Sequence, residues 1–99
     1  SQPAETIERL IRAYDPWPGS YMEIAIQDRV RKCKIYPKCE AISESIGDSG
    51  SLRSDGKTLT IACGSGSLQL NGDLQLEGKK RLPVADFLRG TELPDKTAG

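Results

Sequence analysis

The chain has 99 residues, 36% hydrophobic and 28% charged, a composition typical of one globular domain and not of a disordered segment. Fourteen basic residues balance fourteen acidic ones and histidine is absent, which excludes chemistry that depends on an imidazole base. No apolar run approaches the roughly 18 residues of a membrane span, and the first residues lack the pattern of a signal peptide, so we expect a cytoplasmic protein without membrane contact.

Residues 1–19 are expected to form a helix followed by a linker. Four apolar side chains fall on one stripe at helical spacing: Ile7, Leu10, Ile11 and Tyr14. Pro16 and Pro18 then end the helix, because the residue before a proline disfavours helical backbone angles. Trp17 lies between these prolines, and we expect it to pack the helix against the mouth of a barrel.

From residue 20 onward the apolar residues recur every second position, which is typical of half-buried strands. Residues 20–26 place Met22, Ile24 and Ile26 on one face. Residues 30–36 form a second strand, with Cys33 and Ile35 on one face and three polar side chains on the other: Lys32, Lys34 and Tyr36. A short third strand is expected over residues 39–42.

Residues 43–51 are rich in Ser, Gly and Asp and indicate a loop. The segment 51–63 predicts a hairpin, because Asp55-Gly56 between apolar runs is a strong turn signal. Two more short strands, "SLQL" and "LQL", follow on either side of Asn71-Gly72-Asp73.

Residues 83–90 predict a short C-terminal helix, with Pro83 near its start and Gly90 as its stop, and residues 91–99 are expected to be a loose tail. Between the two helices lie about six short strands, over residues 20–82. Strands of this length with tight turns favour a small closed or nearly closed β-barrel in a single domain covering 1–99.

The three cysteines, Cys33, Cys39 and Cys63, form no CxxC pair, and three lone thiols cannot complete a four-ligand zinc site. We therefore expect reduced cysteines that pack as small apolar side chains, and no metal.

The basic residues are unevenly distributed although the net charge is zero. Five of them lie between Arg29 and Lys38 with no acidic residue among them, and a second cluster is Lys79-Lys80-Arg81. Two interpretations remain open: a patch that contacts phosphates, or the solvated face that any strand presents. Tyr36, next to the first cluster, either adds a stacking surface or covers the core.

Three segments resemble the C-terminal domain of methionyl-tRNA formyltransferases: "IRAYDPWPGSY", "ACGSGSLQL" and "LQLEGKKRLPVADFLRG". The resemblance covers residues 4–90. Related sugar-nucleotide formyltransferases share the Pro-Trp-Pro-Gly turn, whereas "EGKKR" followed by "DFLRG" favours the tRNA branch. Asn71-Gly72-Asp73 lengthens the family's segment between strands, Leu76 stands where the family often has proline, and the loop 42–51 departs from the family pattern.

The resemblance implies a mainly β, OB-like open barrel that follows a Rossmann-type catalytic domain in the same polypeptide. That N-terminal domain would formylate initiator methionyl-tRNA for translation initiation, with formyltetrahydrofolate as co-substrate, and would contain every catalytic residue. The present chain would then be a piece without activity or cofactor of its own, and it would hold the tRNA. The candidate contacts are Arg31, Lys32, Lys34, Lys79, Lys80 and Arg81.

The alternative is a protein-interaction domain of a sugar-nucleotide formyltransferase, in which the basic face contacts protein. A free-standing OB-type binder of single strands is disfavoured, because only 5% of the residues are aromatic and such proteins depend on stacking platforms.

Overall fold

The computed structural model describes residues 3–14, 19–26 and 28–97, so the expected packing of Trp17 lies outside the described residues. The described residues form two helices and eight strands: α1 (Ala4–Tyr14), β1 (Ser20–Ile26), β2 (Arg29–Ile35), β3 (Cys39–Ile42), β4 (Leu52–Ser54), β5 (Leu59–Ala62), β6 (Ser67–Leu70), β7 (Asp73–Leu76), β8 (Arg81–Pro83) and α2 (Val84–Gly90).

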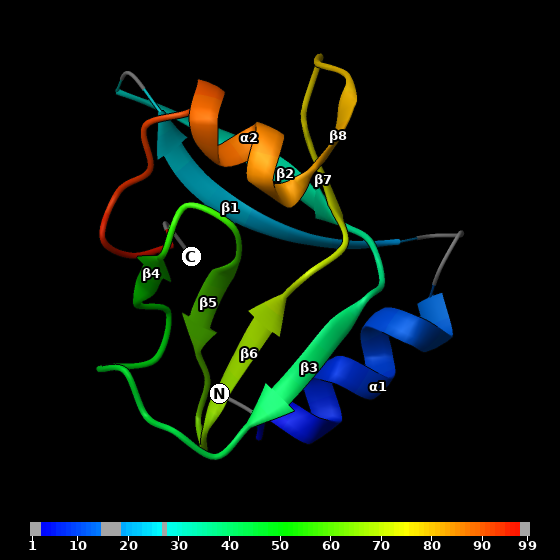
Figure 1. Ribbon diagram of the computed structural model, residues 1–99, viewed down its shortest axis with the longest axis vertical. Helices are drawn as coiled ribbons and strands as arrows, with labels where there is room; N and C mark the ends of the chain where they lie inside the picture. The colour runs from blue at the N-terminus through cyan, green and yellow to red at the C-terminus, as the bar shows by residue number, and fades with distance from the viewer. Residues whose placement is uncertain (1–2, 15–18, 27, 98–99) are drawn as a thin grey trace.

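The strands form two antiparallel sheets of four, in the orders β1-β2-β7-β8 and β3-β6-β5-β4. Figure 1 shows α1 running beside β3 of the second sheet, while α2 lies over the first sheet near β7 and β8. This arrangement confirms the mainly β class with an N-terminal helix and a short C-terminal one. The two separately hydrogen-bonded sheets are compatible with the expected open barrel.

Alternation along the strands produces one core between the sheets. Met22 and Ile24 of β1 face inward together with Cys33 and Ile35 of β2, as their spacing predicts. β7 of the first sheet adds Leu74 and Leu76 to the same cluster. The second sheet and the helices complete it with Ile11, Leu59, Leu68, Leu70, Val84 and Phe87. In α1, Leu10 stays 36% exposed although it belongs to the apolar stripe, and Ala4 is buried in its place.

β8 is absent from the sequence prediction, which is one reason why the structure has more strands than the expected six or so. Arg81–Pro83 is too short to display a period of two, and the pattern of Pro83 alone favours the start of the following helix. The strand forms because it pairs with β7, where Gln75 lies opposite Arg81. Pro83 is compatible with this position because β8 is an edge strand.

The chain crosses between the sheets at Asn71-Gly72-Asp73, the segment that departs from the family pattern. The N–H of Asn71 donates to the Lys38 carbonyl at 2.9 Å, and the N–H of Tyr36 donates to the Asp73 carbonyl at 3.1 Å. A Cβ at Gly72 would lie 2.4 Å from the Lys38 nitrogen. Two crossing segments approach so closely here that only glycine fits.

The C-terminal segment differs from the expected loose tail, because residues 95–97 bond to the second sheet. The N–H of Leu52 donates to the Asp95 carbonyl at 2.7 Å, and the N–H of Thr97 donates to the Gly50 carbonyl at 2.8 Å. These bonds fix the tail beside β4, an edge strand that would otherwise expose its backbone groups.

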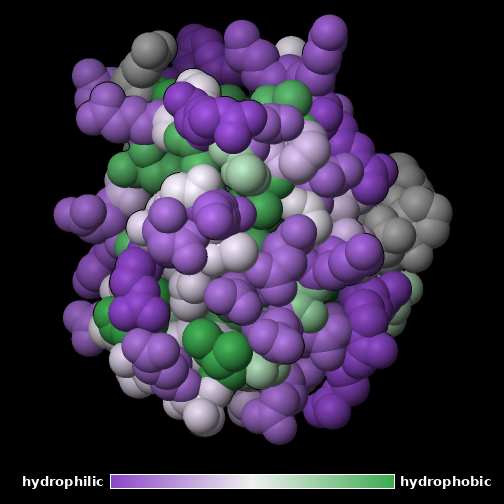
Figure 2. Space-filling view, viewed as in Figure 1, coloured by the Kyte–Doolittle hydropathy of each residue, from purple (hydrophilic) through white to green (hydrophobic). Residues whose placement is uncertain are grey.

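The surface in the view of Figure 2 is mostly hydrophilic, with apolar side chains in several small groups between polar ones. Neither α1 nor α2 has the length and apolar character that crossing a membrane would require, and no other helix occurs among the described residues.

Candidate nucleic-acid interface

The structure divides the six candidate residues into two clusters of three. The first, here called the sheet-face cluster, comprises Lys32, Lys34 and Arg81, on the solvent side of the first sheet. The second, called the groove cluster, comprises Arg31, Lys79 and Lys80, which line a groove beside α2 and the C-terminal segment.

Strand geometry causes this division. Successive side chains of a strand point to opposite faces, so Arg31 and Lys32 diverge although they are neighbours in sequence. Arg31 lies opposite Ile24, a core residue, whereas Lys32 lies opposite the exposed Glu23. The run of basic residues in β2 is therefore not one surface.

The sheet-face cluster belongs to a row of outward side chains that crosses all four strands of the first sheet. Tyr21 is opposite Lys34, Lys34 is opposite Gln75, and Gln75 is opposite Arg81. Cross-strand neighbours of this kind lie about 4.5–5.5 Å apart at their Cβ atoms. The pairing register thus brings together two basic segments that are separated by more than forty positions in sequence.

Tyr36 lies beneath the side chains of the sheet-face cluster, so its ring is not available to stack on a base. Its side chain is buried, with 9% exposure, because the Arg81 guanidinium lies 3.7 Å and the Lys34 Nζ 4.9 Å from its ring centroid. The Tyr36 hydroxyl donates to Gln75 Oε1 at 2.7 Å. Tyr36 therefore offers no free ring for stacking, and it packs under Arg81 instead of joining the central core cluster.

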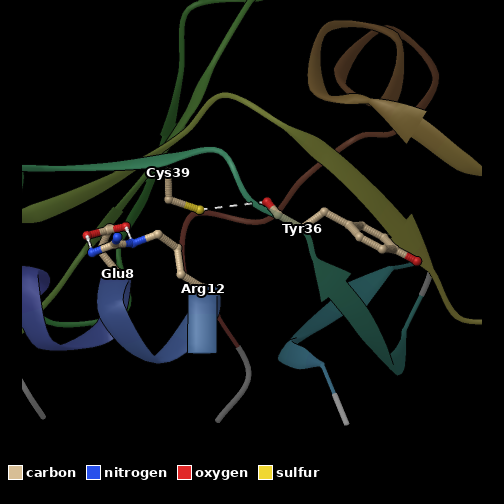
Figure 3. A network of polar contacts seen from close by, with 4 residues as sticks. All are labelled: Glu8, Arg12, Tyr36 and Cys39. Atoms are coloured by element: carbon tan, nitrogen blue, oxygen red, sulfur yellow. Dashed lines mark hydrogen bonds and ion pairs between the residues drawn. The ribbon is translucent and has the colours of Figure 1, made fainter. Parts of the chain in front are cut away.

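Figure 3 shows the other side of Tyr36. The Cys39 thiol points at the backbone carbonyl oxygen of Tyr36, at 3.8 Å. The Tyr36 ring extends away from α1, which carries the Glu8–Arg12 ion pair. Tyr36 thereby connects the sheet-face cluster to the crossing between the two sheets.

Arg81 is bound to the fold more firmly than the neighbouring lysines. Besides stacking on Tyr36, its Nε lies 2.6 Å from Asp73 Oδ2 in an ion pair across β7 and β8. A guanidinium that both stacks on a ring and pairs with a carboxylate is already fixed in position by the fold. Arg81 orders the sheet face, whereas Lys79 and Lys80 lie exposed beside the β7–β8 turn.

Among the described residues of this face, Tyr21 is the exposed aromatic one, although neither a motif nor the basic clusters pointed to it. Its side chain is 53% exposed, and the Lys32 Nζ lies 6.0 Å from its ring centroid. The alternation of β1 indicates this exposure, because Tyr21 lies on the face opposite Met22 and Ile24. A shallow groove runs beside it, lined by Tyr21, Lys32, Lys34, Gln75, Leu76, Glu77 and Gly78.

The groove cluster surrounds a larger hollow of about 810 Å³. Its apolar wall comes from strand, helix and tail residues: Ile26, Leu76, Leu82, Phe87, Leu93 and Pro94. Asp28 and Glu92 also line it, so three cations face two carboxylates. Such a hollow can accept an anion near Arg31, Lys79 and Lys80, and its acidic rim limits where that anion lies.

The cysteines have environments that suppress thiolate chemistry. Burial raises the pKa of Cys33 and of Cys39 to about 12, and for Cys39 the charge of Glu8 adds to the rise. Burial also raises the pKa of the half-buried Cys63. All three are free thiols, and within the described ranges no three residues of the types His, Cys, Asp and Glu gather as a metal site.

Comparison with known sequences identifies the family of the chain. The profile of the formyl transferase C-terminal domain matches residues 1–92. Methionyl-tRNA formyltransferase of Akkermansia muciniphila is 42% identical over 92 residues, covering 91% of this chain and 29% of the relative. The same-named protein of Acidovorax ebreus is 42% identical over 94 residues, covering 94% and 28%, and that of Agrobacterium fabrum is 36% identical over 97 residues, covering 98% and 30%. The chain thus spans about three tenths of the length of these curated relatives.

Proposed function

Because the chain belongs to the family of formyl transferase C-terminal domains, we propose that it is the tRNA-binding domain of a methionyl-tRNA formyltransferase. Its partners are then initiator methionyl-tRNA and an N-terminal catalytic domain of the same polypeptide. The observation that supports tRNA over a protein partner is the sheet register, because it brings the basic segments of β2 and of the β7–β8 hairpin into adjacent positions.

Two separate clusters of Lys and Arg are suited to binding tRNA through its phosphates. Phosphate contacts from Lys and Arg give most of the affinity and fix the orientation of the nucleic acid, while acidic residues near them limit the accessible positions. With zero net charge, the chain attracts RNA through local clusters and not through its overall field.

Formyl transfer belongs, in this proposal, to the catalytic domain, with formyltetrahydrofolate as co-substrate and the methionine amine as acceptor. The present chain contributes binding energy that holds the tRNA near that site. Its own weak affinity, about 10⁻⁴ to 10⁻⁶ M for contacts of this kind, is amplified in the whole protein because tethering raises the effective concentration of the second site.

The decisive experiment reverses charge only where the fold does not depend on it. The Lys79→Glu/Lys80→Glu variant should weaken binding of initiator tRNA, measured by fluorescence anisotropy at low salt, by at least about tenfold. A matched Arg9→Glu/Lys57→Glu variant changes the net charge equally, but neither residue lines either groove, and its affinity should remain near the parent's. Arg81 is left unchanged because its substitution would disturb Tyr36 and Asp73.

Salt dependence gives an independent measurement. If three or four of the exposed cations contact phosphates, log K against log salt should have a slope of roughly −2 to −4 for the parent and a shallower slope for the Lys79→Glu/Lys80→Glu variant. Equal affinities and slopes for the parent, this variant and the Arg9→Glu/Lys57→Glu variant would refute tRNA binding by the groove cluster. Protein interaction would then be the better hypothesis for the groove cluster.

A further inference from the structure

We propose that the shallow groove beside Tyr21 is a subsite for one unpaired RNA nucleotide, whose base stacks on the Tyr21 ring and whose phosphate lies at Lys32. This inference rests on the proposed function and adds a contact to it that is not electrostatic. It concerns the sheet face, whereas the charge-reversal experiment concerns the groove cluster.

The exposure of Tyr21 is the first observation. Tyr36, the other aromatic residue of this face, has its ring covered by Arg81 and its hydroxyl bonded to Gln75. Tyr21 instead keeps 53% of its surface exposed at the wall of a groove. An aromatic ring that lies beside a basic hollow matches the two halves of a nucleotide, a flat base and an anionic phosphate.

The second observation is the arrangement of charge within the groove. Lys32 and Lys34 line it on one side, and the Lys32 Nζ lies 6.0 Å from the Tyr21 ring centroid. Glu77 also lines the groove and lies beside Lys32, because the Glu77 N–H donates to the Lys32 carbonyl at 2.9 Å. The Glu77 carboxylate therefore confines a phosphate to the side of Lys32 that faces Tyr21, where Lys34 also lines the groove. Glu77 itself can accept an N–H from the base edge.

The groove's floor is already ordered before any ligand binds. Gln75 accepts from the Tyr36 hydroxyl and donates to the Lys79 carbonyl at 3.0 Å, so its amide is committed to the fold. Because Tyr21 is the one aromatic among the described residues that line the groove, the subsite takes a single base and not a run of them. Bases paired in a duplex cannot reach such a ring without leaving their stack, which gives the site a preference for unpaired nucleotides.

The test uses the 99-residue chain and a six-nucleotide uridine RNA that carries one 2-aminopurine, a base whose fluorescence falls when it stacks. The parent chain and the Tyr21→Phe variant should quench the fluorescence on binding. The Tyr21→Ala variant should lose the quenching and bind about 5- to 150-fold more weakly, the range expected for one base–aromatic stack. Val30→Ala is the control, because Val30 is 57% exposed on the same sheet but lies outside the groove.

A blunt-ended RNA duplex separates this contact from phosphate binding. Its affinity should fall with Lys32→Gln but remain unchanged with Tyr21→Ala. If the parent does not quench 2-aminopurine, or if Tyr21→Ala quenches as the parent does, the stacking subsite is refuted. Binding of initiator tRNA that weakens in the Lys79→Glu/Lys80→Glu variant would then still support the proposed function, so the two failures are distinguishable. Circular dichroism confirms the fold of each variant.

Discussion

Arg81 provides the sharpest test of whether a basic residue on this surface serves the fold or the ligand. Replacing Arg81 with Gln removes an ion pair with Asp73 and the stack on Tyr36. The paired side chains of Arg81 and Asp73 are 52% and 32% exposed, so solvent screening reduces the ion pair to about 0.5 kcal/mol. The cation–π contact adds about 0.5–1 kcal/mol.

The Arg81→Gln variant should therefore lose about 1–1.5 kcal/mol of unfolding free energy, which lowers Tm by roughly 4–12 °C in a chain of this size. Differential scanning calorimetry measures it, with Lys80→Gln as the control that should shift stability by less than about 0.5 kcal/mol. Asp73→Asn should lose only the ion-pair part, and the double variant should show that the two losses are not additive. The same Tm for Arg81→Gln and Lys80→Gln would refute a structural role for Arg81.

Further expected outcomes concern the crossing, the thiols and the chemistry. Gly72→Ala should destabilise the fold by about 1–3 kcal/mol in urea titration, because its Cβ meets the Pro37 and Lys38 backbone, whereas Gly90→Ala, with open space around its Cβ, should change little. The Cys33 and Cys39 thiols, whose pKa is raised from 9.0 to about 12, stay neutral in the folded chain but ionise when it unfolds. The free energy of unfolding should therefore fall as pH rises from about 9 to about 12. A Cys33→Ala variant whose unfolding free energy falls with pH as steeply as the parent's would contradict this. The chain alone should show no formyl transfer to charged initiator tRNA, and turnover above a blank would refute our placement of the chemistry in another domain.

Local pattern was sufficient to predict much of this protein. The period of two predicted β1 and β2 with their inward faces, because a strand with one buried face must alternate. Asp55-Gly56 predicted the hairpin of β4 and β5, and helical spacing predicted α1. The three segments that resemble the family led to it, and the family profile matches residues 1–92.

Tertiary structure alone decided the composition of the candidate surface. β8 exists through its pairing with β7, which three residues cannot indicate by themselves. The same pairing buries Tyr36 beneath Arg81, whereas Tyr21 stays exposed, although Tyr21 on β1 and Tyr36 directly after β2 both face outward. Sequence gives the face on which a side chain lies, because alternation is a property of one strand. Which side chain remains exposed depends on neighbours from other strands, and only the register brings those neighbours together.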